Sequence, residues 1–472
     1  MKNLKVRWVK GCVLFLLGTS VVFAQNQTPT TSTILPETSL PFSVVIQQAN
    51  FQLPVGIHSG MVGVYQGLWV FIAGKTDGLH GFGPDPFPVL AQNTSIYVVN
   101  PTNGAVYSRS LKDPGSGLTQ AQIDSLSVVS PQGYQEENTL YMTGGYGIDT
   151  ATATYTTKPF LTAIYLPGIV QWVMRKTNAR ASQYIQQLYN PEFQVTGGEM
   201  LKLGNVSQLV FGQDFEGVYT SSSNGNYIEQ VRQFQIGSIG GKLSANIFSS
   251  KPLSQDPNYR RRDMNVLPAI LNTNGKFQYG MVGYGGVFTV SSGVWTVPVV
   301  MDQAGNPSMA NPDLDATFKQ GMNQYVCATT AMYSNKYKSM YSLFFGGISY
   351  GFFSGSTFST DSEIPFINQI TTIQMDQNGN FTQYIMNNQY PVILSTTANP
   401  GNPLLFGAGA YFIRNHTITT YPNTVINLDN IRKPTVIGYI VGGIASTLAN
   451  TNTQADSFGS PYVFTVTVVP KY

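Results

Sequence analysis

Two short segments concentrate charged side chains in a chain that is otherwise poor in charge. The first is Gln213–Gly217, where the carboxylates of Asp214 and Glu216 flank an aromatic residue. Paired carboxylates serve acid–base chemistry or hold a hard cation through their oxygens. Solvation of a loop explains the same spacing without any chemistry. The pair is therefore a candidate ligand site with a plain structural alternative.

The second segment is Tyr259–Asp263, in which three arginines, Arg260, Arg261 and Arg262, precede an aspartate. An arginine fork holds a carboxylate or a sugar acid by two parallel hydrogen bonds. Arg262 and Asp263 are equally suited to a structural ion pair between neighbouring sheets. Both interpretations stay open from the sequence.

Other kinds of chemistry find little support. The three histidines, His58, His80 and His416, include no close pair, so the sequence predicts no metal site and no cofactor. No Gly-x-Ser-x-Gly segment stands between a strand and a helix, as a serine nucleophile would require. Cys327 follows an apolar pair, which predicts a buried and unreactive thiol.

The composition indicates an all-β protein. Charged residues make up only 10% of the chain, while it holds 47 Gly, 27 Tyr and 27 Phe, a profile that suits short strands joined by polar turns. The net charge is +3, and the densest basic run is Arg260–Arg262. The footprint of a nucleic-acid-binding protein is therefore missing.

One figure recurs along the chain: an apolar run that ends in glycine. A repeated figure indicates a repeated structural unit, and glycine lets a strand turn sharply where backbones crowd. The copies are Leu68–Gly74, Leu140–Gly145, Leu209–Gly212, Met281–Gly286, Ser342–Ser349 and Ile437–Gly443.

The strands around these copies predict four-stranded units. In the first unit, Gly60–Tyr65 and Leu68–Gly74 are followed by a long loop and by two strands around Asn103-Gly104, a tight-hairpin signal. The second unit is expected to begin with a strand at Leu126–Ser130. The last unit lacks a fourth strand, and Ser43–Phe51 is a strand without a unit. We therefore expect the N-terminal strand to complete the last sheet and to close a ring of six.

This arrangement predicts where a ligand site lies. Loops between the second and third strands emerge at the same end as the loops between sheets, and such loops on a rigid scaffold favour binding. Tyr219, Tyr350, Asp361 and Glu363 are expected at this end. The candidate ligand-binding residues there are Asp77, His80, Tyr146, Asp149, Asp214, Glu216, Arg260, Arg261, Arg262 and Asp263.

The N-terminus has the pattern of a secretory signal. Four basic residues precede the apolar run Cys12–Phe23, which is too short to span a bilayer, and Val22-Phe23-Ala24 offers a cleavage site. The expected organisation is a signal peptide over 1–24, a flexible leader over 25–42 and a propeller domain over 43–472. The mature protein is expected to lack a transmembrane segment and to reside in the periplasm, at the cell surface or outside the cell.

Residues 43–470 resemble the kelch repeat. The glycine pairs carry the resemblance, together with Tyr97, Asn100-Pro101, Asn103-Gly104 and Tyr107, where tyrosine replaces the usual tryptophan. The chain also looks like a group of exported bacterial kelch-like proteins without an established activity. The resemblance implies a six-bladed β-propeller of four-stranded blades.

Two functions follow as expectations. The first is a non-catalytic binding module for a glycan or a protein at the long-loop end. The second is a sugar-modifying enzyme, similar to exported kelch-type sialic acid mutarotases. In that alternative, Arg260–Arg262, Asp214 and Glu216 are the residues to test.

Overall fold

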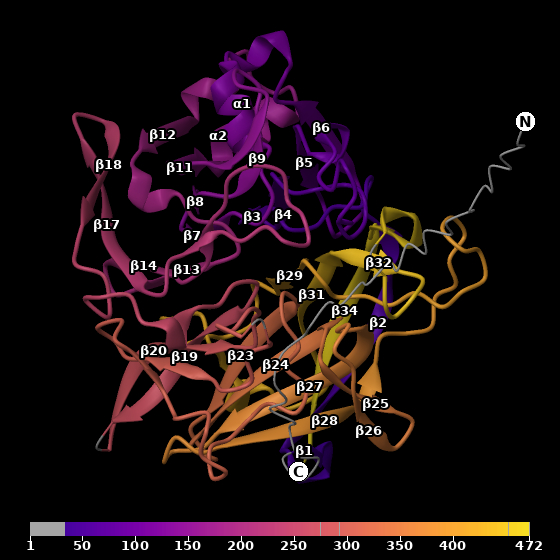
Figure 1. Cartoon of the computed structure of the whole chain (residues 1–472). Helices are drawn as coiled ribbons and strands as arrows, with labels where there is room; N and C mark the ends of the chain where they lie inside the picture. Colours follow the sequence, from indigo (N-terminus) through magenta and orange to yellow (C-terminus); the bar gives the residue numbers. More distant parts are fainter. Residues whose placement is uncertain (1–33, 274, 292, 452, 472) are drawn as a thin grey trace, which may run out of the picture.

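Antiparallel sheets, placed one after another around a common axis, make up most of the molecule (Figure 1). The structure is a computed structural model that describes residues 34–273, 275–291, 293–451 and 453–471. Five sheets have four strands and one has six. The predicted signal peptide lies outside the described residues.

The five four-stranded sheets follow the chain almost in sequence order. They are β3(Met61–Tyr65), β4(Leu68–Ile72), β5(Ser95–Val99) and β6(Val106–Ser110); β7(Gln132–Glu136), β8(Thr139–Thr143), β11(Phe160–Tyr165) and β12(Ile185–Tyr189); β13(Glu199–Leu203), β14(Val206–Val210), β17(Val231–Ile239) and β18(Lys242–Ile247); β19(Asn265–Thr273), β20(Lys276–Tyr284), β21(Val299–Met301) and β22(Pro307–Met309); and β29(Ala410–Arg414), β31(Thr435–Gly442), β34(Tyr462–Pro470) and β2(Phe42–Gln52).

The remaining large sheet differs from the expected four strands. Its central strands are β23(Ala328–Ser334), β24(Ser339–Ile348), β27(Phe366–Met375) and β28(Phe381–Gln389), and two short strands, β1(Ile34–Pro36) and β30(Ile426–Asn427), add to its edges in parallel. The structure therefore does not contain the expected six blades of four strands each. Residues 34–36, placed by the sequence in a flexible leader, form one of these edge strands.

Two short helices share a core with the first two sheets: the second helix contacts β3, β5, β6 and β11, and the first contacts the strand β9(Tyr146–Asp149). They are α1(Gln120–Leu126) and α2(Leu166–Val173). The expected strand at Leu126–Ser130 is wrong: Leu126 ends α1, which starts at a capping box of Thr119 and Gln122, and the segment after it makes only an isolated bridge at Val129 before Ser130 adopts φ +49°. The first strand of the second sheet is β7 instead.

A closed ring of backbone hydrogen bonds marks the axis. Six residues, each just before the first strand of a sheet, donate an N–H to the carbonyl of the preceding member at 2.6–3.2 Å, and the first donates to the last. All six have φ between +45° and +65°. We call them the axial ring: Ser59, Ser130, Gly197, Asp263, Val326 and Gly409.

The first strands meet below this ring. β3 contacts β7, β7 contacts β13, β13 contacts β19, β19 contacts β23 and β23 contacts β29. The last sheet then packs on the first through aromatic side chains. The ring centroids of Trp69 and Tyr439 are 5.1 Å apart, and those of Phe71 and Tyr411 are 6.1 Å apart. The sheets thus share one hub, and the arrangement is a β-propeller.

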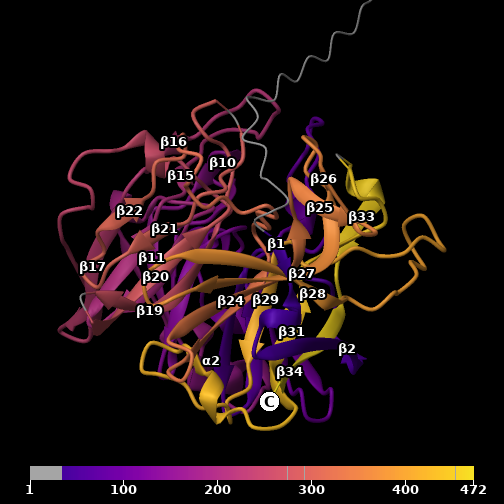
Figure 2. The same cartoon turned by 90° about the horizontal axis from the view of Figure 1, so that it is seen from below.

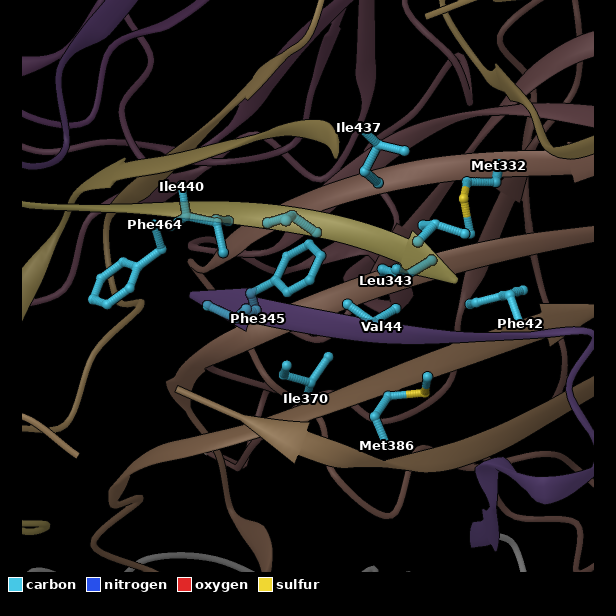
Figure 3. Close-up of a cluster of buried hydrophobic side chains, with 14 of the residues drawn as sticks. Phe42, Val44, Met332, Leu343, Phe345, Ile370, Met386, Ile437, Ile440 and Phe464 are labelled. Carbon is cyan, nitrogen blue, oxygen red and sulfur yellow. The ribbon is translucent and has the colours of Figure 1, made fainter. Parts of the chain in front are cut away.

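The N-terminal strand closes the propeller, as the sequence predicts. β2 pairs antiparallel with β34, from Phe42 opposite Pro470 to Gln48 opposite Phe464. Figure 2 shows the indigo β2 beside the yellow β34. Phe42 and Val44 enter a core cluster with Leu343 and side chains from β27, β28 and β31 (Figure 3). The two ends of the chain are therefore held by one core.

The glycine figures connect neighbouring sheets. In all six copies two consecutive residues have φ of 53–66° and then 84–93°; they are the last two residues of five copies and Gly346-Gly347 in the copy Ser342–Ser349. The second residue donates its N–H to the next sheet in most copies, for example Gly145 to the Val195 carbonyl at 2.9 Å. A Cβ on Gly144 would stand 1.8 Å from that same carbonyl oxygen. Glycine is therefore needed because adjacent backbones touch there.

Candidate functional site

The long loops gather at the end of the propeller that carries the axial ring. In the first three sheets, the residue just before the axial-ring member forms an antiparallel β-bridge with the residue just after the glycine figure. The bridged pairs are His58 with Lys75, Val129 with Tyr146 and Thr196 with Gln213. Beyond these bridges the loops form hairpins: β9(Tyr146–Asp149) with β10(Thr154–Thr157), β15(Gln213–Asp214) with β16(Asn226–Tyr227), β25(Gly351–Ser354) with β26(Thr357–Thr360), and β32(Ile444–Ser446) with β33(Ser457–Gly459).

Arg262 and Asp263 lie at the centre of this end. One Arg262 guanidinium N–H donates to the Tyr219 hydroxyl at 2.7 Å, and Arg262 Nε stands 3.6 Å from Asp263 Oδ2. The guanidinium carbon is 4.8 Å from the centroid of Phe288. The Nε–H is buried, faces the Asp263 carboxylate and makes no hydrogen bond. This cation is therefore fixed in orientation, with 13% of its side-chain surface exposed.

Burial and charge act against each other on these groups. Burial lowers the pKa of Arg262, but Tyr219 and Asp263 outweigh it and leave this pKa above its usual value. Burial raises the pKa of Asp263, and Arg262 opposes the rise. The side chain of Asp263 still keeps 27% of its surface exposed. Asp263 therefore remains in contact with solvent beside the buried guanidinium.

Aromatic rings surround this pair. His80 packs against Tyr219 at 4.8 Å and stacks on Phe87 at 5.1 Å between ring centroids. Burial lowers the pKa of His80 to about 4, so its ring is neutral near pH 7. Tyr325 is also close, because Asp263, Tyr219 and Arg262 all influence its pKa, which burial raises. We call Tyr219, Arg262, Asp263 and Tyr325 the axial cluster.

Asp77 is engaged in an ion pair at the edge of this region. Its carboxylate lies 2.9 Å from Lys75 Nζ, whose residue is 1% exposed. Its backbone carbonyl accepts from His58 at 3.1 Å, and burial lowers the pKa of His58 to about 3. Asp77 therefore holds the first long loop against the hub.

Arg261 has a structural role, which corrects its place among the candidate ligands. It is fully buried, and one N–H group contacts the carbonyls of Gly285 and Val297 at 3.4 and 3.3 Å. Its guanidinium lies 4.4 Å from the Trp295 ring. Burial lowers its pKa to about 9. Arg260, by contrast, lies over Tyr227 at 3.7 Å beside the axial cluster.

The remaining candidates are dispersed over the loops. Tyr146 is buried and donates its hydroxyl to the Gly217 carbonyl at 2.6 Å. Asp149 caps a turn and faces Lys158 at 3.6 Å. Asp214 accepts from Gln194 at 3.0 Å, while Glu216 is exposed. Asp214 and Glu216 therefore have different surroundings, and Asp214 is held by an amide.

Sequence reasoning missed several residues of the region. Tyr325 and Phe288 carry no local signal, because only the ring brings three different sheets to the axis. Glu199, two residues after Gly197 of the axial ring, was missed for the same reason. Burial raises its pKa to about 8. The expectation for Cys327 is confirmed: it is buried and free, and burial raises its pKa to about 12.

Comparison with known proteins adds little. No family model matches the chain, and no curated protein does. Among solved structures, that of YjhT is similar, with 11% sequence identity and a TM-score of 0.44 over 89% of this chain and 98% of that one. The propeller arrangement therefore rests on the sheets and the axial ring. Among the described residues, no helix is long and apolar enough to cross a membrane.

Proposed function

We propose that the protein is a non-catalytic binding module for acidic glycans and that the axial cluster is its ligand site. The observation that carries the proposal is Arg262. Its guanidinium is fixed by Tyr219, lies beside Phe288 at the centre of the long-loop end, and keeps 13% of its side-chain surface exposed. A largely desolvated guanidinium binds a carboxylate strongly because the hydrogen bonds are charge-assisted.

The surroundings suit the rest of a sugar acid. The rings of Tyr219, Phe288 and Tyr325 present apolar faces with polar edges, which is how aromatic side chains bind amphipathic ligands. Asp263 accepts hydrogen bonds from hydroxyl groups. Neutral His80 supports the Tyr219 ring by packing. A carboxylate on the guanidinium and a ring on the aromatic faces together define an acidic monosaccharide unit.

The test compares acidic and neutral sugars on one protein. We expect N-acetylneuraminic acid or glucuronic acid to bind in calorimetry and on a glycan array, and N-acetylglucosamine to bind more weakly. Arg262→Gln is expected to weaken binding of the acidic sugars at least about tenfold, because one charge-assisted hydrogen bond contributes about 1.5–3 kcal/mol. Arg262→Lys keeps the charge but loses the fork, and an intermediate affinity is expected.

The matched control is Arg432→Gln, which removes an exposed arginine elsewhere on the chain. Thermal unfolding of each variant separates lost binding from lost folding. Equal affinity of wild type and folded Arg262→Gln contradicts the proposal. Absence of binding to any sugar redirects the assignment to a protein partner on the same end.

A sugar-modifying enzyme is the second candidate, and Asp263 is the observation that favours it. Burial raises the pKa of this carboxyl, which lies beside a guanidinium, and carboxyl groups with a raised pKa often serve as general acids. Exchange of sugar anomers, followed by NMR, distinguishes the two functions. Turnover that is lost in Asp263→Asn while binding persists favours the enzyme.

The proposal includes two finer features of the chain. We propose that the six-stranded sheet occupies one blade position, so that the propeller has six radial units of kelch-like type; the six members of the axial ring support this. We also propose export after cleavage before Gln25, which rests on the N-terminal sequence. Mass spectrometry of the mature N-terminus tests the cleavage.

A further inference from the structure

A recess opens at the end of the hub remote from the axial ring. It encloses about 300 Å³ between the first strands β29, β3 and β7, at the seam where the last sheet meets the first. Val64 comes five residues after Ser59 of the axial ring, which corresponds to roughly 17 Å along a strand. This recess is therefore separate from the axial cluster.

One wall of the recess is apolar and rigid. Val62, Val64 and Phe412 line it. The Phe412 ring is stacked on Phe345 at 5.9 Å with an interplanar angle of 5°, so its orientation is set by the core. The wall therefore offers a preformed apolar surface for the body of a small ligand.

The Gln135 amide at the recess is already satisfied, whereas the exposed His416 ring also lines the recess. Gln135 accepts from the Val64 N–H at 2.7 Å and donates to the Val64 carbonyl at 2.7 Å. It also donates to the Glu137 carbonyl at 2.7 Å. The amide thereby seals the edge of β3, which leaves Arg414, Glu137 and His416 to contact the polar groups of a ligand.

Arg414 is the cation of the recess. One guanidinium N–H donates to the Ile418 carbonyl at 3.1 Å. No carboxylate forms an ion pair with Arg414 among the described residues. Burial lowers its pKa. A partly buried arginine without a counter-ion is costly, and a bound anion removes that cost.

We infer that this recess binds a small organic carboxylate with an apolar body, and that an apolar α-amino acid fits it best. The carboxylate binds the Arg414 fork, and the apolar side chain packs on Val62, Val64 and Phe412. Glu137, exposed at the rim, accepts the amino group.

Three matched probes test the assignment: L-phenylalanine, 3-phenylpropanoate, which lacks the amine, and 2-phenylethylamine, which lacks the carboxylate. Saturation-transfer NMR and calorimetry on the full-length protein are expected to rank their affinity in that order. Arg414→Met is expected to weaken the binding of L-phenylalanine and of 3-phenylpropanoate at least about tenfold, because it removes a charge-assisted pair. Arg432→Met, at an exposed arginine, is the matched control.

A second variant tests the site even if Arg414→Met fails to fold. Glu137 lies in an exposed turn, and Glu137→Gln is expected to weaken the binding of L-phenylalanine severalfold while leaving the affinity for 3-phenylpropanoate unchanged. The inference is overturned when wild type binds none of the probes at millimolar concentration, or when Arg414→Met and Arg432→Met bind alike. Because none of these variants touches the axial cluster, failure here leaves the glycan proposal standing, and the reverse also holds.

Discussion

At the scale of single residues, the hub places ionisable groups where water is scarce. Arg262, Asp263 and Glu199 all come within two residues of the axial ring or belong to it. Arg262 and Asp263 neutralise each other in part. Burial alone raises the pKa of Glu199, and no charged partner among the described residues opposes it. The difference makes Glu199 the residue whose ionisation disturbs the folded state most directly.

The pH dependence of stability should expose Glu199. Its folded-state pKa of about 8 lies above the usual value of 4.5, so the native protein binds the proton more tightly than the unfolded chain does. Stability is therefore expected to fall as the pH rises from about 4.5 to 8. Glu199→Gln should remove part of that fall, on the order of 1–3 kcal/mol after allowance for its partial exposure.

Chemical denaturation of wild type and Glu199→Gln at pH 5 and pH 9 measures this effect. The two proteins should differ little at pH 5, where the carboxyl is protonated, and the variant should be the more stable at pH 9. A constant difference at both pH values would assign the effect to packing instead.

At the scale of elements, the glycine figures connect neighbouring sheets. Its two left-handed residues turn the second strand of a sheet toward its neighbour, and the backbone N–H of the second then bonds the next sheet. Ala73 and Phe211 occupy the first of these positions in two copies. The left-handed conformation is thus retained where glycine itself is not.

Two glycines with matched backbone angles separate conformational strain from steric contact. Gly144 has φ +61°, and a Cβ added to it would lie 1.8 Å from the Val195 carbonyl oxygen. Gly240 has φ +58°, and a Cβ added to it would have no atom within 4 Å. Gly240→Ala is expected to cost about 1 kcal/mol, the usual penalty of the left-handed region. Gly144→Ala should cost at least about 2 kcal/mol more.

Urea unfolding of the two variants gives the comparison. Similar losses of stability would mean that neighbouring sheets move apart easily and that the close approach at Gly144 is not a constraint. A larger loss for Gly144→Ala would confirm that the contact between sheets, and not the turn alone, requires glycine.

At the scale of the whole molecule, β2 joins the beginning of the chain to its end. Its buried face, which includes Phe42, Val44 and Ile46, belongs to the same core cluster as side chains of the six-stranded sheet. The axial ring and this seam together leave the last sheet paired on both sides of β34. We therefore expect the propeller to unfold as one cooperative unit.

One strand carries both the test of this seam and its control. Val44→Asp places a charge in the core cluster, where Val44 is 1% exposed, and is expected to cost more than about 3 kcal/mol. Gln47→Asp, on the exposed side of β2, should cost less than about 1 kcal/mol. Differential scanning calorimetry measures both. An unchanged unfolding transition in Val44→Asp would show that β2 is not part of the cooperative unit.

Local patterns in the sequence determined a large part of this molecule. The glycine figures located the second strand of every sheet, and the lone strand at 43–51 predicted the closure with 462–469. Both signals are local, because alternation and glycine report the backbone of a single strand. The edge strands β1 and β30 escaped prediction because their short segments acquire strand geometry only from their neighbours.

The candidate site depended on tertiary structure. Three consecutive arginines look equivalent in sequence, yet Arg261 is fully buried against Trp295, whereas Arg262 meets Tyr219 near the axis. They differ because Arg261 and Arg262 follow one another in a loop before β19 and contact different neighbours, and only the ring brings distant loops to one axis. The spacing of these residues along the chain does not indicate which of them meet at the axis. The grouping of Tyr219, Arg262, Asp263 and Tyr325 therefore depends on the closure of the propeller.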